Sequence, residues 1–312
     1  MRGGAEARQP LLDAGFEVVD APPGCCSDEE SLIALLDGYD AVIAGNEAYT
    51  DRVFAALPRL KVVARWGVGV DAVDLAAATR HGRIVTNTPG VLADAVADLA
   101  WMFMLALARR WREAEQRVLS GGWGEVFGVS LTGKTLGIIG LGAIGQCVAR
   151  RGNGFGMTCI GYDPQPNEPA VEALGLRLTS LDQVLREADF LSLHAKTTPE
   201  NAGMIGEAQL KLMKPTAYLI NTARGALLDQ VALARALQEG WIAGAGLDVL
   251  AQEPPAANEA LLRIPNCLIT PHCGSANNET ARAVNALVCQ NIVEAFSDTR
   301  PRFLVNADLR TA

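Results

Sequence analysis

Three polar side chains with complementary chemistry each follow an apolar stretch in the second half of the chain. They are Arg224 in Asn-Thr-Ala-Arg-Gly, Glu253 in the segment 248–254, and His272 directly after Pro271. A histidine can take up and return a proton near neutral pH, and a neighbouring carboxylate orients its ring. An arginine can bind a carboxylate through two parallel hydrogen bonds and polarise the adjacent carbonyl. The three residues therefore predict proton transfer at an alcohol or ketone next to a carboxylate.

A glycine-rich segment supplies the second chemical signal. Gly140-Leu141-Gly142-Ala143-Ile144-Gly145 follows an apolar run at 135–139 and precedes a helical stretch. Such glycines allow a tight turn, close approach to a pyrophosphate and close helix packing, with the phosphates at the helix N-terminus. Asp163 comes 18 residues after Gly145, where a carboxylate binds ribose hydroxyls and repels the additional phosphate of NADP. The segment predicts an NAD site, and the alternative is a glycine turn with a capping aspartate.

Each of the three catalytic candidates also has a purely structural interpretation. His272 could cap or pack at a strand end, Glu253 could be solvated before Pro254, and Arg224 could join a surface ion pair. The three together favour the catalytic interpretation, because such a site needs a proton carrier, its partner and an anion-binding group. Of the other two histidines, His81 is expected to end a helix and His194 to line the cofactor pocket.

The elements that must position these residues form a doubly wound α/β domain. Short apolar runs alternate with helical stretches, which indicates a parallel sheet with helices on both faces. The carboxyl ends of parallel strands lie on one edge of a sheet, so Arg224, Glu253 and His272 should face the same crevice as the nicotinamide. The six strands are predicted at 135–139, 158–162, 190–193, 217–220, 245–248 and 267–269.

The first part of the chain predicts a second, smaller α/β domain of flavodoxin-like type. Its strands are expected at 16–19, 41–44, 60–64 and 83–86, and a helix at about 278–297 should return to it. We therefore expect a substrate domain of residues 1–92 and 277–312, with the NAD-binding domain, residues 93–276, inserted. Only four residues precede the first expected helix, so the usual first strand is missing. Either the true start lies upstream, or the sheet of this domain has one strand fewer. We favour a truncated or mis-set start, because the loss of a strand inside the sheet would leave backbone groups unpaired.

Composition excludes several classes of function. The net charge of −8 and the pI near 5.0 argue against nucleic-acid binding, which relies on clustered Lys and Arg. The first residues lack the apolar core of a signal peptide, and the run 99–108 has about half the roughly 20 residues that a membrane span needs. Seven cysteines without a CxxC pair predict neither disulfides nor a metal site. We expect a cytoplasmic protein with no membrane or nucleic-acid partner.

These motifs resemble the D-isomer-specific 2-hydroxyacid dehydrogenases, in the branch of phosphoglycerate dehydrogenase and glyoxylate/hydroxypyruvate reductase. The resemblance covers about Leu57 to Asn306, and its segments include Arg-Trp-Gly-Val-Gly-Val-Asp at 65–71 and Asn-Thr-Pro-Gly at 87–90. It implies a catalytic set of Arg224, Glu253 and His272, with His272 as the acid/base. It implies substrate binding by Arg65, Val68, Gly69, Arg224 and His272, with the substrate carboxylate on the amides of Val68 and Gly69. It implies NAD binding by Gly140, Gly142, Ala143, Ile144, Gly145, Asp163, Ala195, Thr222, Ala223, Arg224, Asp248, His272 and Gly274.

The resemblance leaves the substrate open. It favours NAD-dependent interconversion of a D-2-hydroxy acid and its 2-keto acid of the phosphoglycerate dehydrogenase type. However, the loop 44–48 has no basic residue for a substrate phosphate, and Glu47 would repel one. Hydroxypyruvate or glyoxylate reduction is therefore an alternative, and an NAD-sensing interaction protein without enzymatic activity is another.

The predicted long helix at about 94–120 bears on oligomerisation. It is apolar nearly all round, so it must be covered on more than one side. In the family this helix packs against a partner subunit, which predicts a homodimer. The alternative is a helix buried within its own domain.

Overall fold

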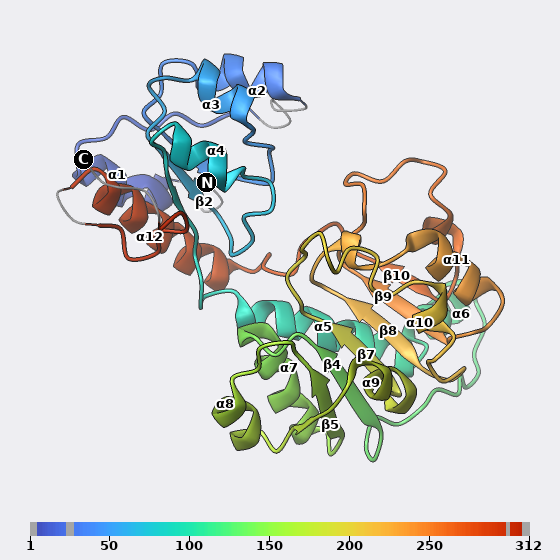
Figure 1. Ribbon diagram of the computed structural model, residues 1–312. Helices are drawn as coiled ribbons and strands as arrows, with labels where there is room; N and C mark the ends of the chain where they lie inside the picture. The colour runs from blue at the N-terminus through green and yellow to red at the C-terminus, as the bar shows by residue number, and fades with distance from the viewer. Residues whose placement is uncertain (1–4, 23–27, 298–299, 308–312) are drawn as a thin grey trace. The chain divides into compact units, whose positions relative to one another are not determined.

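The computed structural model of the chain describes residues 5–22, 28–297 and 300–307. The chain folds into two compact units, one of residues 1–92 and 275–312 and the other of residues 93–274 (Figure 1). No helix of the described residues is both long enough and apolar enough to cross a bilayer. The opening residues 1–4, on which part of the signal-peptide argument depends, lie outside the described residues.

The smaller unit has a three-stranded parallel sheet with the order β1-β2-β3. Val63 of β2 packs with α2, α3 and α4 on one face, whereas Val62 and Ala64 pack with α1 and α12 on the other. These helices are labelled in Figure 1. This alternation follows from the two-residue period of a strand and explains why Val62, Val63 and Ala64 are all apolar although they face opposite sides. The elements are η1 (Ala5–Arg8), α1 (Gln9–Asp13), α2 (Glu29–Leu36), β1 (Ala41–Ala44), α3 (Asp51–Ala56), β2 (Val62–Arg65), α4 (Leu75–Arg80), β3 (Ile84–Thr86) and α12 (Asn278–Ala295).

The predicted strand at 16–19 is wrong. Residues 16–20 belong to neither helix nor strand, although Phe16 and Val18 pack against the cluster that contains α1 and α12. A strand needs a neighbour for its backbone groups, and no described strand pairs with this segment. The apolar pattern therefore reflects the partial burial of Phe16 and Val18, which does not require sheet pairing.

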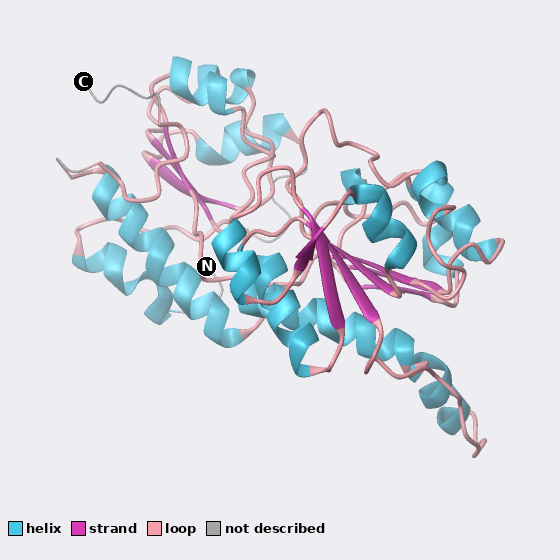
Figure 2. Cartoon of the chain, turned by 60° about the horizontal axis from the view of Figure 1, so that its bottom comes forward, coloured by secondary structure: helices cyan, strands magenta, loops and turns pink. Residues whose placement is uncertain are grey.

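The larger unit contains a seven-stranded parallel sheet with the order β10-β9-β8-β7-β4-β5-β6. Figure 2 shows the strands of this sheet in magenta among cyan helices. The strand order reverses between β4 and β7, and ligands of such sheets bind outside the carboxyl ends of the strands at this point. The six predicted strands are present, and a seventh, the two-residue β6, was not predicted. The strands are β4 (Thr135–Ile139), β5 (Thr158–Tyr162), β6 (Arg177–Leu178), β7 (Phe190–Leu193), β8 (Tyr218–Asn221), β9 (Gly244–Leu247) and β10 (Cys267–Ile269).

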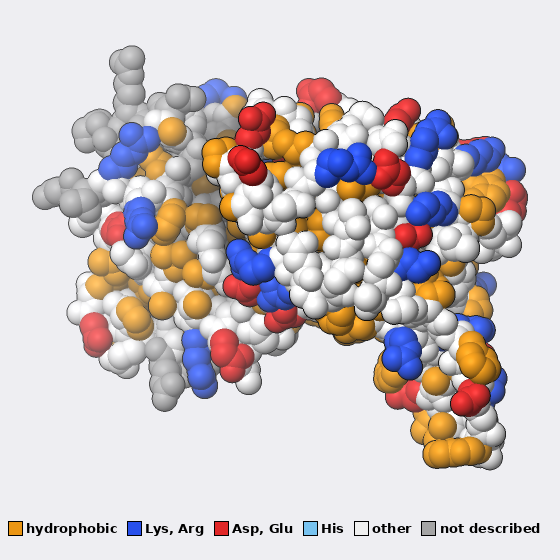
Figure 3. Space-filling view, turned by 90° about the horizontal axis from the view of Figure 1, so that it is seen from below, with side chains coloured by type: hydrophobic (Ala, Val, Ile, Leu, Met, Phe, Trp, Pro, Cys, Tyr) orange, Lys and Arg blue, Asp and Glu red, His pale blue; other side chains and the backbone are white. Residues whose placement is uncertain are grey.

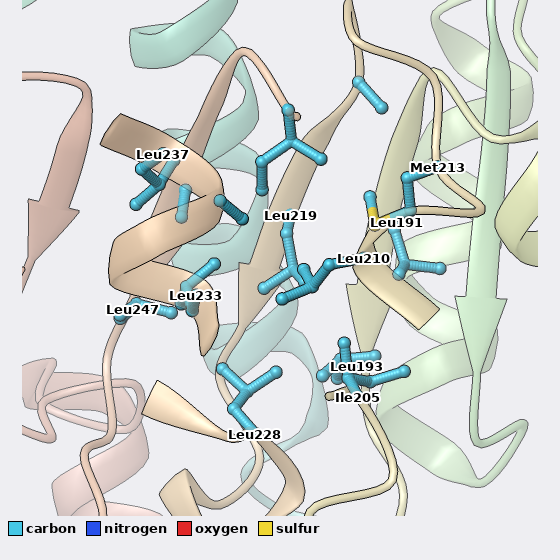
Figure 4. Packing of buried hydrophobic residues seen from close by; sticks show 14 of the residues in the cluster. Leu191, Leu193, Ile205, Leu210, Met213, Leu219, Leu228, Leu233, Leu237 and Leu247 are labelled. Carbon is cyan, nitrogen blue, oxygen red and sulfur yellow. The ribbon is translucent and has the colours of Figure 1, made fainter. Parts of the chain in front are cut away.

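Helices cover both faces of this sheet. Leu191 and Leu193 of β7 and Leu219 of β8 pack against Leu210 and Leu233 on one face (Figure 4). On the opposite face, Phe190 packs in a separate cluster with α5 and α7. The helices are α5 (Ala93–Ala108), α6 (Trp111–Leu119), α7 (Ala143–Gly154), α8 (Glu168–Ala173), α9 (Leu181–Glu187), α10 (Glu207–Leu210), η2 (Gly225–Leu227), α11 (Gln230–Gln238) and η3 (Ala260–Arg263).

The single helix predicted at 94–120 is two helices. Arg110 adopts a left-handed backbone conformation, with φ of 49°, and ends the continuity between α5 and α6. The apolar α5 is largely buried in its own unit, whereas α6 has no buried residue. Burial along the segment thus ends at Arg109–Arg110, where the apolar pattern of the sequence also ends.

Candidate active site

His272 and Glu253 form a close pair in the larger unit. The Nδ1 atom of His272 lies 2.6 Å from Oε2 of Glu253, and both side chains are about one-third exposed, at 33% and 34%. The other carboxylate oxygen, Oε1, accepts a hydrogen bond of 3.0 Å from the amide of Leu250. With both of its oxygens engaged, the carboxylate fixes the ring orientation and leaves Nε2 as the nitrogen that can serve a substrate.

The ionisation of Glu253 is set by opposing effects. Burial alone would raise the pKa of this carboxyl, but the hydrogen bonds from His272 and from the Leu250 amide lower it. The positive charges of His272 and Arg224 act in the same direction, and the pKa of Glu253 falls below its ordinary value. The residue is therefore a carboxylate at neutral pH.

A buried carboxylate fixes the loop that carries His272. Asp248, only 2% exposed, follows β9 and accepts hydrogen bonds from Thr270 Oγ1 at 2.6 Å and from the Cys273 and Gly274 amides at 2.8 Å each. The His272 amide donates to the Asp248 carbonyl at 2.8 Å, and His272 has a positive φ of 50°. A positive φ is unfavourable for a residue with a side chain, so these bonds must hold it in place.

Arg224 lies on the loop after β8, and Asn221 organises that loop. The Asn221 side chain donates to the Arg224 carbonyl at 2.8 Å and accepts from the Ala223 amide at 3.0 Å. The Arg224 guanidinium donates to the Ala223 carbonyl at 2.7 Å. Since β8, β9 and β10 are adjacent parallel strands, their following loops lie on one edge of the sheet. The structure thus brings Arg224 to the same edge as Glu253 and His272.

The glycine-rich segment lies at the carboxyl end of β4, beside the point where the strand order reverses. A side chain at Gly140 would lie 2.4 Å from the Ala195 amide nitrogen, whereas nothing lies within 4 Å of the same position at Gly142. Gly142 is the N-cap of α7 and has no side chain to cap its amides. Gly140 is therefore packed tightly against the neighbouring backbone, whereas the space beside Gly142, at the N-terminus of α7, is free for an anion.

Asp163 is positioned at the end of β5 by two backbone amides. One oxygen accepts from Leu141 at 2.7 Å, and the other accepts from Gln165 at 2.8 Å. The carboxylate therefore joins the glycine-rich turn to the strand that follows it. This is the place where a dinucleotide's ribose hydroxyls would meet a carboxylate.

Three buried polar atoms after β7 and β8 have no hydrogen-bond partner among the described residues: His194 Nδ1, Thr197 Oγ1 and Thr222 Oγ1. Buried polar atoms are normally paired, so these atoms fit a bound ligand that supplies partners. Together with the glycine-rich turn and Asp163, they fit a dinucleotide. His194 Nε2 pairs with Ser192 Oγ at 2.8 Å, and burial lowers the pKa of His194 to about 3.

The predicted substrate-binding loop belongs to the smaller unit and follows β2. The Gly67 amide donates to Thr88 Oγ1 at 3.0 Å, the Thr88 amide donates to the Gly67 carbonyl at 2.9 Å, and Asn87 Nδ2 donates to the Val68 carbonyl at 2.8 Å. The amides of Val68 and Gly69 donate to no described residue. The loop thus presents two successive N–H groups, an arrangement that binds anions.

Sequence reasoning missed several residues that hold these loops. Thr197, whose hydroxyl has no partner among the described residues, gave no signal, because a Thr after a strand is common in turns. Asn221 belongs to the quoted Asn-Thr-Ala-Arg-Gly segment, but its bonds to residues 223 and 224 were not predicted. Thr88 and Asn87 belong to a quoted motif, but their bonds to residues 67–68 depend on the tertiary fold. No cluster of three or more possible metal ligands occurs in the described part of the chain.

Comparison with known proteins identifies the family. The model described as "D-isomer specific 2-hydroxyacid dehydrogenase, NAD binding domain" matches residues 101–274. The chain is 47% identical to a glyoxylate reductase from Thermococcus litoralis over 291 residues, covering 89% of this chain and 88% of the relative. It is 42% identical to a glyoxylate reductase from Thermococcus kodakarensis over 309 residues, covering 96% and 92%.

Solved structures agree with this assignment. A glyoxylate reductase from Paecilomyes thermophila has a TM-score of 0.86 at 31% identity, covering 96% of this chain and 94% of that one. An NADPH-dependent glyoxylate/hydroxypyruvate reductase from Sinorhizobium meliloti, in complex with NADP and malonate, has a TM-score of 0.85 at 32% identity, covering 98% and 96%. These likenesses favour the glyoxylate reductase branch over the phosphoglycerate dehydrogenase type, which the sequence motifs favoured. The chain belongs to the D-isomer specific 2-hydroxyacid dehydrogenase family and is an NAD-binding oxidoreductase that acts on a CH–OH group.

Proposed function

We propose that this protein reduces a small, non-phosphorylated 2-keto acid, glyoxylate or hydroxypyruvate, to the 2-hydroxy acid with NADH. The observation that carries the proposal is the 2.6 Å contact between His272 Nδ1 and Glu253, on the sheet edge that also presents Arg224. The names of the relatives support the substrate class, since those named above are glyoxylate or glyoxylate/hydroxypyruvate reductases.

The residues divide the chemistry among them. NADH, which the glycine-rich turn and Asp163 would hold, would supply the hydride for the carbonyl carbon. Protonated His272 donates its Nε2 proton to the carbonyl oxygen, while its Nδ1–H remains bonded to Glu253. Arg224 binds the substrate carboxylate and polarises the carbonyl, and the Val68 and Gly69 amides bind the same carboxylate. In the reverse direction, neutral His272 accepts the hydroxyl proton.

The cofactor preference follows from Asp163. A carboxylate at the end of β5 accepts hydrogen bonds from ribose hydroxyls and repels a 2′-phosphate. The segment that follows, Pro164-Gln165-Pro166, offers no cation to offset that repulsion. We therefore propose NAD over NADP, and expect Asp163→Ala to narrow the ratio of kcat/KM for NADH over NADPH by at least about tenfold.

A homodimer is part of this proposal. Large apolar side chains are exposed on α6 and the segment after it, among them Leu119 at 79%, Trp123 at 92% and Phe127 at 77%. Figure 3 shows hydrophobic side chains gathered on the projecting segment at the lower right of the view. An apolar patch of this kind marks an interaction surface, and a second copy of the chain is its proposed partner.

The test is NADH oxidation, with NADPH in parallel, against glyoxylate, hydroxypyruvate, pyruvate and 3-phosphohydroxypyruvate. We expect turnover of glyoxylate or hydroxypyruvate, and a loss of about 10²- to 10⁴-fold in kcat/KM for His272→Ala. A preference for 3-phosphohydroxypyruvate would contradict the substrate class. Equal rates of the wild type and His272→Ala would contradict the mechanism.

A further inference from the structure

An unpaired carboxylate lies in the loop that follows β1 in the smaller unit. Glu47 is half-buried, and its Oε2 atom is buried without a hydrogen-bond partner among the described residues. Its side chain folds back over the loop, because a Cβ at Gly45 would lie 2.7 Å from Oε1 and 3.0 Å from Oε2. A buried carboxylate oxygen without a donor is costly, which points to a donor that arrives with a ligand.

Arg65 connects this loop to the substrate-binding loop. Strands β1 and β2 are parallel neighbours, with Ala44 beside Arg65, so the segments after them start at the same edge of the sheet. The Arg65 guanidinium donates to the Ala44 carbonyl at 3.3 Å, to the Trp66 carbonyl at 2.6 Å and to the Asn46 side chain. A Cβ at Gly67 would lie 3.3 Å from the same guanidinium. Glu47 therefore lies on a loop held against the one that presents the Val68 and Gly69 amides.

From this arrangement we infer that Glu47 selects the substituent at C3 of the substrate by accepting a hydrogen bond from a C3 hydroxyl group. The inference rests on the proposed function, in which those two amides bind the carboxylate at C1. It assigns the preferred substrate as a 3-hydroxy-2-keto acid, of which hydroxypyruvate is the smallest. A hydroxyl can donate to the carboxylate, a methyl group cannot, and a phosphate would be repelled.

The experiment compares two substrates that differ only in this hydroxyl. The kcat/KM ratio of hydroxypyruvate over pyruvate is measured with NADH for the wild type, Glu47→Ala and Glu47→Gln. A hydrogen bond to a charged group corresponds to about 10- to 100-fold in such a ratio, so Glu47→Ala should lower it by that factor. Glu47→Gln keeps the volume and one acceptor oxygen but loses the charge, and its ratio should lie between the other two.

The control is Glu17→Gln, which removes an exposed carboxylate of the same unit and should leave the ratio at the wild-type value. Glyoxylate, which has no C3, separates this inference from the proposed function. A wild type that reduces glyoxylate, with a hydroxypyruvate-to-pyruvate ratio that stays within twofold in both Glu47 variants, would overturn the inference and leave the proposed function standing. A wild type that reduces none of the keto acids would overturn both.

Discussion

Gly225 lies directly against the Leu250 carbonyl group. A Cβ at residue 225 would lie 2.0 Å from the carbonyl carbon of Leu250 and 2.2 Å from its oxygen. Gly225 follows Arg224, and the Leu250 amide binds the Glu253 carboxylate. The glycine therefore allows the loop of the arginine and the loop of the glutamate to approach each other, and a side chain there would force them apart.

The substitution Gly225→Ala should consequently reduce both stability and activity. We expect the free energy of unfolding to fall by about 1–3 kcal/mol, because the atoms that would clash belong to the backbone and cannot rotate away. Urea unfolding and kcat/KM are the two measurements. Gly154→Ala is the matched control, since nothing lies within 4 Å of a Cβ at that position. Two variants of equal stability would show that the loops can separate without cost.

The carboxylate of Glu253 should give stability a dependence on acid pH. Its pKa in the folded protein is below the ordinary value of 4.5, so its contribution is present above that value and is lost as the pH falls through the lower folded pKa. Because the side chain is one-third exposed, we expect less than about 1 kcal/mol. In Glu253→Gln, the loss of stability between pH 6 and pH 3.5 should be smaller than in the wild type. An identical loss in both proteins would argue against the predicted linkage.

Much of the larger unit could be predicted from the sequence, because its central strands are buried on both faces. Strands β4, β7 and β8 are short, nearly continuous apolar runs, which is typical of parallel strands under two helical layers. The two-residue β6 at the sheet edge has exposed side chains and gave no such pattern. The segment 16–19 shows the opposite error, since Phe16 and Val18 pack against a core cluster and are partly buried, without any strand pairing.

The sequence could predict which residues form the site, but not the hydrogen bonds that hold their loops in place. His272 and Glu253 stood out because acid/base chemistry needs them and each follows a strand. The Asp248 carboxylate accepts hydrogen bonds from Thr270 and from two loop amides. These bonds depend on how β9 and β10 align, which no local sequence pattern specifies. The unpaired oxygen of Glu47 likewise results from the fold of its loop around Gly45.

Burial of His194 should make the protein less stable in mild acid. Its pKa is lowered to about 3, so between its ordinary pKa of 6.5 and that value the unfolded chain binds a proton that the folded chain does not. Stability is thus highest above pH 6.5 and falls as the pH decreases. From pH 7.5 to pH 5 this one residue should account for about 2 kcal/mol.

The variant His194→Asn removes this titration and keeps a polar side chain beside Ser192. Between pH 7.5 and pH 5, its free energy of unfolding should fall by about 2 kcal/mol less than that of the wild type. The matched comparison is His81→Asn, at the end of α4, where the ring is paired with Asp51 at the surface. A wild-type pH slope that persists in His194→Asn would show that other groups are responsible.

The exposed apolar segment after α6 should determine the oligomeric state. We expect Trp123→Asp, which places a charge where the indole is 92% exposed, to shift the protein from dimer toward monomer in sedimentation velocity. The free energy of unfolding should change little at low protein concentration, because the side chain has few contacts within its own chain. Val231→Asp on α11, where the valine is 82% exposed, adds the same charge at another exposed apolar position and should leave the dimer intact. A wild type that sediments as a monomer would contradict the dimer, and a Trp123→Asp dimer as stable as that of Val231→Asp would place the interface elsewhere.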